Sequence, residues 1–334
     1  MTRPLPRPPL IDRFGRTHTY VRISVTDRCN FRCVYCMPEE GLSWMPRSEL
    51  LRYEEICAVL RAFARMGVRK VRLTGGEPTL RADIESLIAG LAAIPGLDDI
   101  AMTTKGLTLD KLAGRLARAG LHRVNISIDS VDPERFRRLT RGGDLSRVIR
   151  GIEAAREAGL TPIKLNAVVL KGENEEDLHG LVDWAGNWPD DLELRFIEYM
   201  PFEARWHESV ASSELRRRLS ERLTLEPDGT RGHTAGPARM WKIAQTGLRV
   251  GFISPLSEHF CARCNRLRLQ ADGHLRTCLA HEDTPSLRDL LRAGADEDTL
   301  EQAIRTMVLG KPEGHDCGLD DGTVFEGVMT GIGG

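Results

Sequence analysis

Six short strand-like segments recur along the chain, and longer segments with a helical period separate them. The strand-like segments are residues 20–26, 70–74, 100–104, 123–129, 163–169 and 192–199, and in at least four of them apolar and polar residues alternate, as is typical of β-strands. Between these segments, apolar residues recur at spacings of three and four, which predicts helices over residues 49–66, 81–93, 109–119, 145–158 and 175–185. This regular alternation predicts an α/β fold with a parallel sheet and right-handed crossovers.

At least four of the predicted strands have one polar face. In the first, Val21 and Ile23 alternate with Arg22 and Ser24, and segments 70–74, 123–129 and 163–169 follow the same pattern. Strands covered by helices on both faces are nearly continuous apolar runs, and a closed eight-stranded barrel fills its interior with branched apolar side chains. We therefore predict a partial barrel of six strands with a polar lumen. A sheet with one face in solvent is the alternative.

The pattern changes after residue 200. Residues 239–253 are predicted to form a β-hairpin around Thr246-Gly247, and residues 265–278 a second one around Ala271-Asp272-Gly273. Two helices, over residues 286–292 and 298–308, and a glycine-rich tail follow. We predict a flexible segment over residues 1–13, the partial barrel over residues 14–205, and a C-terminal α+β extension over residues 206–334.

Composition narrows the classes of function. A chain of 334 residues with a net charge of −1 lacks the large basic field of proteins that bind nucleic acid or anionic membranes, so we expect neither partner. Residues 1–9 lack the apolar core of a secretory signal, and no apolar run is long enough to span a bilayer. Six of the eight cysteines fall into two short groups, which favours metal ligation in a reducing compartment over disulfides. We expect a cytoplasmic protein.

Cys29, Cys33 and Cys36 form the first cysteine group. A structural zinc ion takes four protein ligands, and iron–sulfur cubanes are usually held by four thiolates. A loop with three thiolates therefore leaves one metal position open for a small molecule. A zinc knuckle completed by a distant His or Cys is the alternative.

The spacing Cys-x3-Cys-x2-Cys, with aromatic Tyr35 before the last cysteine, resembles the cluster loop of the radical S-adenosylmethionine (SAM) enzymes. The resemblance implies a (β/α)6 barrel, a [4Fe-4S] cluster on Cys29, Cys33 and Cys36, and SAM bound to its open iron and cleaved to a 5′-deoxyadenosyl radical. The turn Gly75-Gly76-Glu77-Pro78 directly follows a predicted strand, and its glycines allow close approach of a ligand to the backbone. The resemblance also implies SAM contacts for four residues: Tyr35, Gly76, Ser127 and Met200.

Cys261, Cys264 and Cys278 form the second cysteine group. A zinc site could be completed by one of four residues, His259, His274, His281 or Cys317. Two groups of three cysteines fit better as two clusters, each with one open iron.

The length of the turn in the second hairpin determines which face of the sheet its arginines share with the cysteines. A three-residue turn places Arg268 opposite Arg276 and Arg266 opposite Cys278, so that arginines and cysteines share one face of the sheet. A two-residue turn would put Cys278 on the other face. Guanidinium groups beside an open iron suit a phosphorylated ligand that also binds metal. Arginines that simply face solvent are the alternative.

Within the superfamily, the run Cys264-Asn265-Arg266-Leu267-Arg268 and the closing Gly331-Ile332-Gly333-Gly334 resemble the MoaA family, the GTP 3′,8-cyclases of molybdenum cofactor biosynthesis. The resemblance implies two [4Fe-4S] clusters with GTP between them. It also implies the residues that bind GTP: Arg22, Arg72, Thr103, Lys164, Arg266 and Arg268.

The reaction so implied cyclises GTP to (8S)-3′,8-cyclo-7,8-dihydroguanosine 5′-triphosphate, with Arg22 positioning the base or delivering a proton. Expected partners are a reducing electron donor such as a flavodoxin and a downstream cyclic pyranopterin synthase, and the protein is expected to be a monomer or homodimer. Lys105 replaces an asparagine usual in the family, and either contacts phosphate or points to solvent. The Gly333-Gly334 tail either reaches the active site or frays. Two other functions stay open: a radical SAM peptide-modifying enzyme with an auxiliary cluster, and a non-enzymatic zinc or iron–sulfur module.

Overall fold

The computed structural model describes residues 7–200, 208–229, 236–281, 285–315 and 317–319. Its centre is an eleven-stranded sheet with the order β11-β10-β1-β2-β3-β4-β5-β6-β9-β8-β7. The six strands predicted for the barrel lie side by side and are all parallel. Their bounds are β1 (Tyr20–Ser24), β2 (Lys70–Thr74), β3 (Asp99–Thr104), β4 (Arg123–Ser127), β5 (Ile163–Val169) and β6 (Leu192–Glu198).

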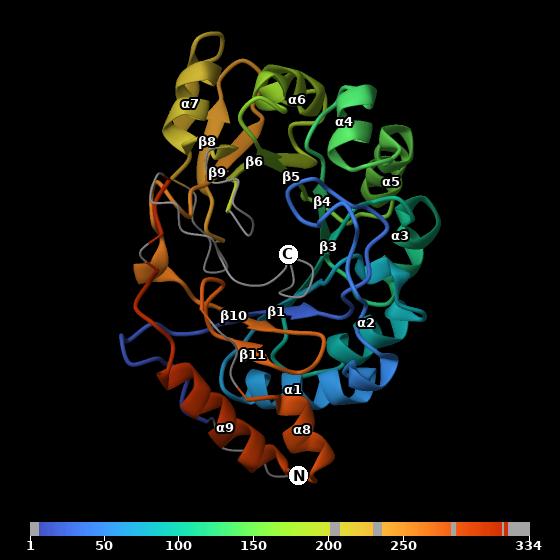
Figure 1. The fold of residues 1–334 in the computed structure, drawn as a ribbon, viewed down its shortest axis with the longest axis vertical. Helices are drawn as coiled ribbons and strands as arrows, with labels where there is room; N and C mark the ends of the chain where they lie inside the picture. Colours follow the sequence, from blue (N-terminus) through green and yellow to red (C-terminus); the bar gives the residue numbers. More distant parts are fainter. Residues whose placement is uncertain (1–6, 201–207, 230–235, 282–284, 316, 320–334) are drawn as a thin grey trace.

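Helices follow these strands and lie on the outside of the curled sheet (Figure 1). They are α1 (Tyr53–Arg65), α2 (Ile84–Ala92), α3 (Leu109–Arg118), α4 (Pro133–Leu139), α5 (Leu145–Glu157) and α6 (Leu178–Ala185). Short 3-10 turns, η1 (Arg47–Glu49), η2 (Pro78–Leu80) and η3 (Glu175–Asp177), precede α1, α2 and α6. This arrangement confirms the predicted α/β fold with its parallel sheet.

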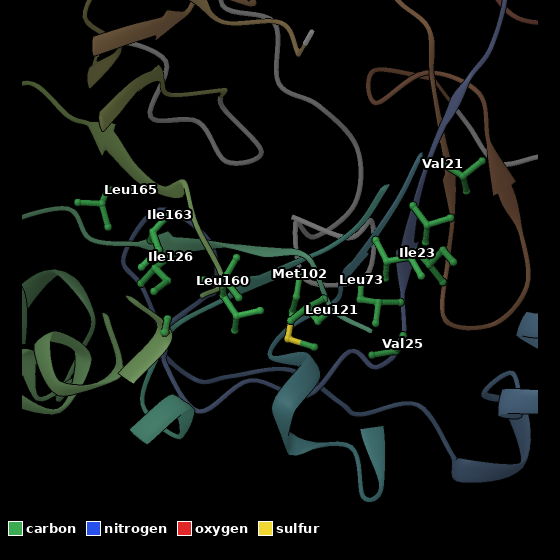
Figure 2. Close-up of a cluster of buried hydrophobic side chains, with 14 of the residues drawn as sticks. Val21, Ile23, Val25, Leu73, Met102, Leu121, Ile126, Leu160, Ile163 and Leu165 are labelled. Carbon is green, nitrogen blue, oxygen red and sulfur yellow. The ribbon is translucent and has the colours of Figure 1, made fainter. Parts of the chain in front are cut away.

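The apolar face of the strands packs against the helices. Figure 2 shows Val21, Ile23, Leu73 and Met102 gathered in this core, and all four are completely buried. Complete burial of such side chains stabilises the fold by about 1.5–3 kcal/mol each. The alternating residues point the other way, so the polar face of the sheet surrounds the interior of the barrel.

The C-terminal extension adds strands at both edges of the barrel sheet. β9 (Arg249–Ile253) pairs parallel with β6, followed outward by β8 (Arg239–Ile243) and β7 (Leu225–Pro227). At the other edge, β10 (Arg266–Leu269) pairs parallel with β1 and antiparallel with β11 (Leu275–Arg276). The helices are α7 (Ser212–Ser220), α8 (Leu287–Arg292) and α9 (Glu297–Leu309), and the 3-10 turn η5 spans Cys261–Arg263. The predicted division at residue 205 stays a prediction.

Both predicted hairpins form. β8 and β9 pair antiparallel, and in the second hairpin Arg268 lies opposite Arg276. Gly273 has φ +91°, and the Gln270 N–H donates to the His274 carbonyl (2.9 Å), as a three-residue turn requires. The two-residue alternative is therefore wrong.

Among the α-helices and strands of the described residues, three were not predicted: α4, α7 and β7. Helix α4 had a readable signal, because Pro133 starts it and the Asp132 side chain caps it by accepting from the Arg135 N–H. Its seven residues were too few for a clear helical period. Among the described residues, no helix combines the length and the apolar character that a membrane crossing requires.

Candidate active site

One cavity lies inside the barrel, and polar side chains from successive strands line it. Arg22 comes from β1, Arg72 from β2, Thr103 from β3, Ser127 from β4 and Lys164 from β5. The polar face predicted from the alternation thus encloses a cavity, and the alternative of a sheet face in open solvent is wrong.

All the predicted site residues except Cys33 line this cavity. They are Arg22, Cys29, Tyr35, Cys36, Arg72, Gly76, Thr103, Ser127, Lys164, Met200, Cys261, Cys264, Arg266, Arg268 and Cys278. Cys33 is buried in the same loop, where its carbonyl accepts from the N–H groups of Cys36 (2.9 Å) and Met37 (3.1 Å). The individual roles of these residues stay predictions. The Gly333-Gly334 tail lies outside the described residues.

The first cysteine loop and the glycine turn are held together through their backbones. The Gly76 N–H donates to the Thr26 carbonyl (2.8 Å), and the Glu77 N–H donates to the Arg28 carbonyl (2.7 Å). A Cβ atom on Gly76 would lie 2.2 Å from the Arg28 carbonyl oxygen. Only glycine therefore fits at this position, directly beside the cysteine loop.

Replacing Gly76 with alanine should force the cysteine loop away from the turn. We expect a loss of about 3 kcal/mol in the free energy of unfolding, at the upper end for overpacked sites, together with weaker SAM binding. Urea denaturation and equilibrium SAM binding measure the two effects. Gly229→Ala is the matched control, because an added Cβ there meets no atom within 4 Å. Equal stability of the two variants would contradict the close packing.

The Glu77 carboxylate fixes the other side of the glycine turn. Its oxygens accept hydrogen bonds from the Thr79 hydroxyl (2.6 Å), the Thr104 hydroxyl (2.8 Å) and the Lys105 N–H (2.6 Å). Four partly or fully buried residues therefore connect the ends of β2 and β3. The turn is held rigidly where a ligand of the first cysteine group would lie.

Lys105 lines the cavity beside the first cysteine group, and its Nζ donates to the Ser127 hydroxyl (3.3 Å). Burial lowers the pKa of Lys105, but the negative charges of Cys33, Cys29 and Cys36 outweigh this effect, so the pKa is raised. Burial also raises the pKa of Cys29 and Cys33, and Lys105 opposes that rise. Of the two alternatives for Lys105, the one in which it points to solvent is therefore wrong, because its ammonium group lies in the cavity near the thiols.

In the second cysteine group, Cys261 begins η5, Cys264 directly follows η5, and Cys278 lies two residues beyond β11. Burial raises the pKa of Cys264, but the positive charges of Arg266 and Lys311 lower it by more, so that the pKa falls to about 7. The Lys311 Nζ donates to the Arg266 carbonyl (3.0 Å), and the Arg16 Nη1 donates to the Cys261 carbonyl (2.9 Å). Cationic side chains from distant parts of the chain thus favour a thiolate at this loop.

Arg276 differs from its neighbours on the hairpin. Arg266, Arg268 and Cys278 line the cavity as expected, but Arg276 does not. Its Nε donates to the His281 carbonyl (2.6 Å), which holds the loop after Cys278. Arg276 therefore supports the loop instead of facing the cavity.

Neither cysteine group is shaped for a single metal ion. In the part of the chain that the structure describes, no three His, Cys, Asp or Glu side chains are grouped so that they could hold one ion. A cubane cluster binds its thiolates through different iron atoms and so tolerates a wider spacing. The donor sets, three thiols each, fit a cluster with an open iron better than a structural zinc.

Further cationic residues line the cavity, and they were not predicted from the sequence. They are Lys70, Arg195 and Lys311, and Tyr20 also lines the cavity. Burial, followed by repulsion from Arg195, lowers the pKa of Lys164 to about 6. Tyr20 and Lys70 could have been found, because each lies two residues from a predicted lumen position, Arg22 or Arg72. Arg195 could have been found from its alternation with apolar Leu194 and Phe196.

Several buried polar atoms of cavity residues have no hydrogen-bond partner among the described residues. They are the Tyr20 hydroxyl, the Arg72 Nε, the Thr103 hydroxyl, both amide atoms of Asn125 and the Asn166 Oδ1. Each buried unsatisfied polar atom costs about 1–3 kcal/mol. A polar ligand in the cavity would satisfy them.

Comparison with known proteins decides the family. Residues 23–185 match the Radical SAM superfamily model, and residues 192–317 match the Molybdenum Cofactor Synthesis C model. A GTP 3′,8-cyclase from Pseudomonas syringae pv. syringae (strain B728a) is 46% identical over 334 residues, covering 98% of this chain and 99% of the relative. The chain belongs to the GTP 3′,8-cyclase family of radical SAM enzymes. A family member from Rhodopseudomonas palustris (strain TIE-1) is 47% identical over 321 residues, covering 93% and 91% of the two chains.

Solved structures share the fold of this GTP 3′,8-cyclase family member. Streptococcus suis SuiB bound to precursor peptide SuiA superposes with a TM-score of 0.62 at 17% identity, covering 94% of this chain and 76% of SuiB. Native anSMEcpe with bound AdoMet gives a TM-score of 0.57 at 14% identity, covering 86% and 81%. Identities this low establish the fold alone, which confirms the predicted radical SAM barrel with a C-terminal extension.

Membership of the GTP 3′,8-cyclase family confirms that the chain is a radical SAM enzyme, and it implies a [4Fe-4S] cluster, SAM and GTP as substrate. The residues of the first cysteine group fit that cluster, as described above. The alternative of a non-enzymatic zinc or iron–sulfur module is wrong. The family also speaks against a peptide-modifying enzyme, although SuiB shares the barrel.

Proposed function

We propose that this enzyme converts GTP to (8S)-3′,8-cyclo-7,8-dihydroguanosine 5′-triphosphate, the first step of molybdenum cofactor biosynthesis, with two [4Fe-4S] clusters facing one cavity. The observation that carries the proposal is that both cysteine groups open onto the same cavity. Cys29 and Cys36 line it together with Cys261, Cys264 and Cys278. A substrate between the groups could meet SAM at one end and an open iron at the other.

The first group is the SAM end of the cavity. A cluster on Cys29, Cys33 and Cys36 would supply, with SAM, the 5′-deoxyadenosyl radical. The backbone at Gly76 and Tyr35 would bind SAM closely, since the glycine turn has no side chain to obstruct it. Ser127, whose hydroxyl accepts from Lys105, would contact the ribose or carboxylate, and Met200 would pack near the adenine.

The cationic part of the cavity suits the triphosphate. Arg72 on β2 and Lys164 on β5 line the barrel wall, and Arg266 and Arg268 on β10 line the same cavity. Guanidinium groups bind phosphate through paired donors, and their attraction is strong where water is excluded. The unsatisfied hydroxyl of Thr103 adds a neutral donor. We propose that the guanine then lies near Cys264.

The reaction removes the 3′ hydrogen of the ribose, joins C3′ to C8 of guanine, and ends with uptake of one electron and one proton. Arg22 is our candidate for positioning the base or delivering that proton. It is partly buried, and burial lowers its pKa to about 10 with help from Arg72 and Arg266. A lowered pKa makes proton transfer from a guanidinium less unfavourable.

Partners follow from this chemistry. We propose a reducing electron donor of the flavodoxin type for the first cluster and a cyclic pyranopterin synthase to consume the product. We propose a monomer or homodimer in the cytoplasm, where it could meet both partners and where the reducing environment keeps the thiols reduced.

The test uses anaerobically reconstituted enzyme with SAM, a reductant and GTP carrying deuterium at the ribose 3′ position. We expect 5′-deoxyadenosine that contains the deuterium, together with a cyclised GTP product in equal amount. Mass spectrometry measures both. Cleavage of SAM that requires a peptide, or 5′-deoxyadenosine without deuterium, would contradict the proposed reaction.

A further inference from the structure

Tyr20 lies at the start of β1, where its ring is buried in the wall of the cavity. Lys70 of β2 and Arg266 of β10 flank it in register on the two neighbouring strands. Its hydroxyl has no hydrogen-bond partner among the described residues. A buried phenol without a partner is unfavourable, so the position calls for a ligand.

The surroundings of the Tyr20 hydroxyl are cationic. The Lys70 Nζ lies 5.0 Å and the Arg72 Cζ 5.6 Å from the ring centroid. Arg22 on the same strand, and Arg266 and Arg268 on β10, also interact with Tyr20 electrostatically. Asp99 on β3, which follows Lys70 across the sheet, is already paired with Lys70 (3.3 Å) and Arg123. The positive charge around the phenol therefore exceeds the negative charge.

We propose that Tyr20 is a phosphate-binding residue, whose hydroxyl donates a hydrogen bond to the triphosphate of GTP. The inference rests on the proposed function, which puts the triphosphate among these cations. The Tyr20 hydroxyl adds a neutral hydrogen-bond donor among the charged groups. A phosphate oxygen at this place would accept from both the phenol and the guanidinium groups.

Protonation of the Tyr20 hydroxyl distinguishes phosphate binding from a role in packing, because only phosphate binding would couple GTP affinity to this proton. Burial raises the pKa of Tyr20, but Arg72, Arg22, Lys70 and Arg266 lower it more, to about 8. A bound polyanion disfavours the tyrosinate, so binding raises the pKa and draws a proton onto the hydroxyl. GTP affinity should therefore fall as the pH rises through about 8, because the free enzyme then loses the proton that the complex needs.

The test compares the wild type with Tyr20→Phe, which keeps the ring and removes the hydroxyl. Reconstituted enzyme without reductant binds GTP but does not turn it over, so isothermal calorimetry gives equilibrium affinities. At pH 7 we expect GTP to bind Tyr20→Phe about tenfold more weakly, as for loss of a hydrogen bond to a charged group. Binding of guanosine, which has no phosphate, should be unchanged.

Proton uptake is the second measurement. At pH 8, calorimetry in buffers of different ionisation enthalpy should show that GTP binding takes up more protons in the wild type than in Tyr20→Phe. Burial lowers the pKa of Lys70, which is present in both proteins, and the charge of Tyr20 raises it. The difference in proton uptake between the wild type and Tyr20→Phe therefore reports Tyr20 together with its effect on Lys70. The matched control is Tyr53→Phe, because the Tyr53 hydroxyl donates to the Ala82 carbonyl (2.7 Å) and Tyr53 does not line the cavity.

Equal GTP affinity and equal proton uptake in the wild type and Tyr20→Phe would overturn the inference. Equal weakening of GTP binding and guanosine binding in Tyr20→Phe would also overturn it, since a change in the ring packing or the fold would then be responsible. These outcomes differ from failure of the proposed function, in which the wild type itself would bind GTP no better than guanosine.

Discussion

Replacing Cys29 with serine should reduce SAM cleavage to the background of enzyme without iron. Cys29 lines the cavity and belongs to a loop with three thiols, so its loss leaves only two of the three thiolates assigned to the first cluster. The hydroxyl of serine does not ionise at neutral pH and cannot replace the thiolate. The amount of 5′-deoxyadenosine formed with SAM and reductant, with and without GTP, measures the effect.

The control for Cys29→Ser is Cys57→Ser. Cys57 lies on α1, is partly buried against the core and does not line the cavity. This variant should keep full SAM cleavage and full iron content. Iron analysis and the electron paramagnetic resonance spectrum of the reduced protein separate loss of the cluster from loss of activity. Equal SAM cleavage by the wild type and Cys29→Ser would refute the assignment of the first cluster.

Periodicity predicted the barrel well because the helices and the lumen impose different demands on the two faces of each strand. The bounds predicted for β2 and β5 agree with the structure at both ends. The polar residues of these strands, Arg72 and Lys164, line the cavity as expected. The local sequence pattern was sufficient here, because successive side chains of a strand point to opposite faces of the sheet.

The second hairpin illustrates the same point at the site. Its register followed from the turn Ala271-Asp272-Gly273, because a glycine with positive φ allows a three-residue turn. The pairing brought Arg266 and Arg268 to the cavity with the second cysteine group. It did not bring Arg276 there, because a contact with the His281 carbonyl competes for that guanidinium. Register determines the face of a residue, but not the partner of a long side chain.

Contacts between distant segments could not be predicted from local patterns. The Arg16 guanidinium forms an ion pair with Asp12 (2.6 Å) and donates to the Pro312 and Glu313 carbonyls (both 2.6 Å). It thereby holds the segment around Lys311 against the second cysteine group. Nothing in the periodicity of either segment indicates the other, since almost 300 residues separate them. The Lys311 ammonium and its effect on Cys264 became apparent only from the fold.

Replacing Cys264 with serine should separate the two halves of the proposed reaction. The variant keeps the first cysteine group, so it should still cleave SAM, but the cleavage should no longer be coupled to cyclisation of GTP. It should lose cyclised GTP product by more than the factor of about 10–100 typical for residues that only support a metal ligand. Arg266 and Lys311 lower the pKa of Cys264 to about 7, and a serine hydroxyl would not respond in this way. Iron content should fall by the share of one cluster.

Cys317→Ser is the matched control and tests the open iron of the second cluster. Cys317 is buried beside Leu256, and the His259 ring nitrogen lies 3.1 Å from its carbonyl oxygen, so it is close to the second cysteine loop without lining the cavity. If the second cluster has three protein thiolates, Cys317→Ser should keep its iron and its GTP turnover. Loss of one cluster in Cys317→Ser, equal to the loss in Cys264→Ser, would mean a fourth protein ligand. The guanine would then have no open iron to bind, and the second cluster could act on the substrate only from a distance, by electron transfer.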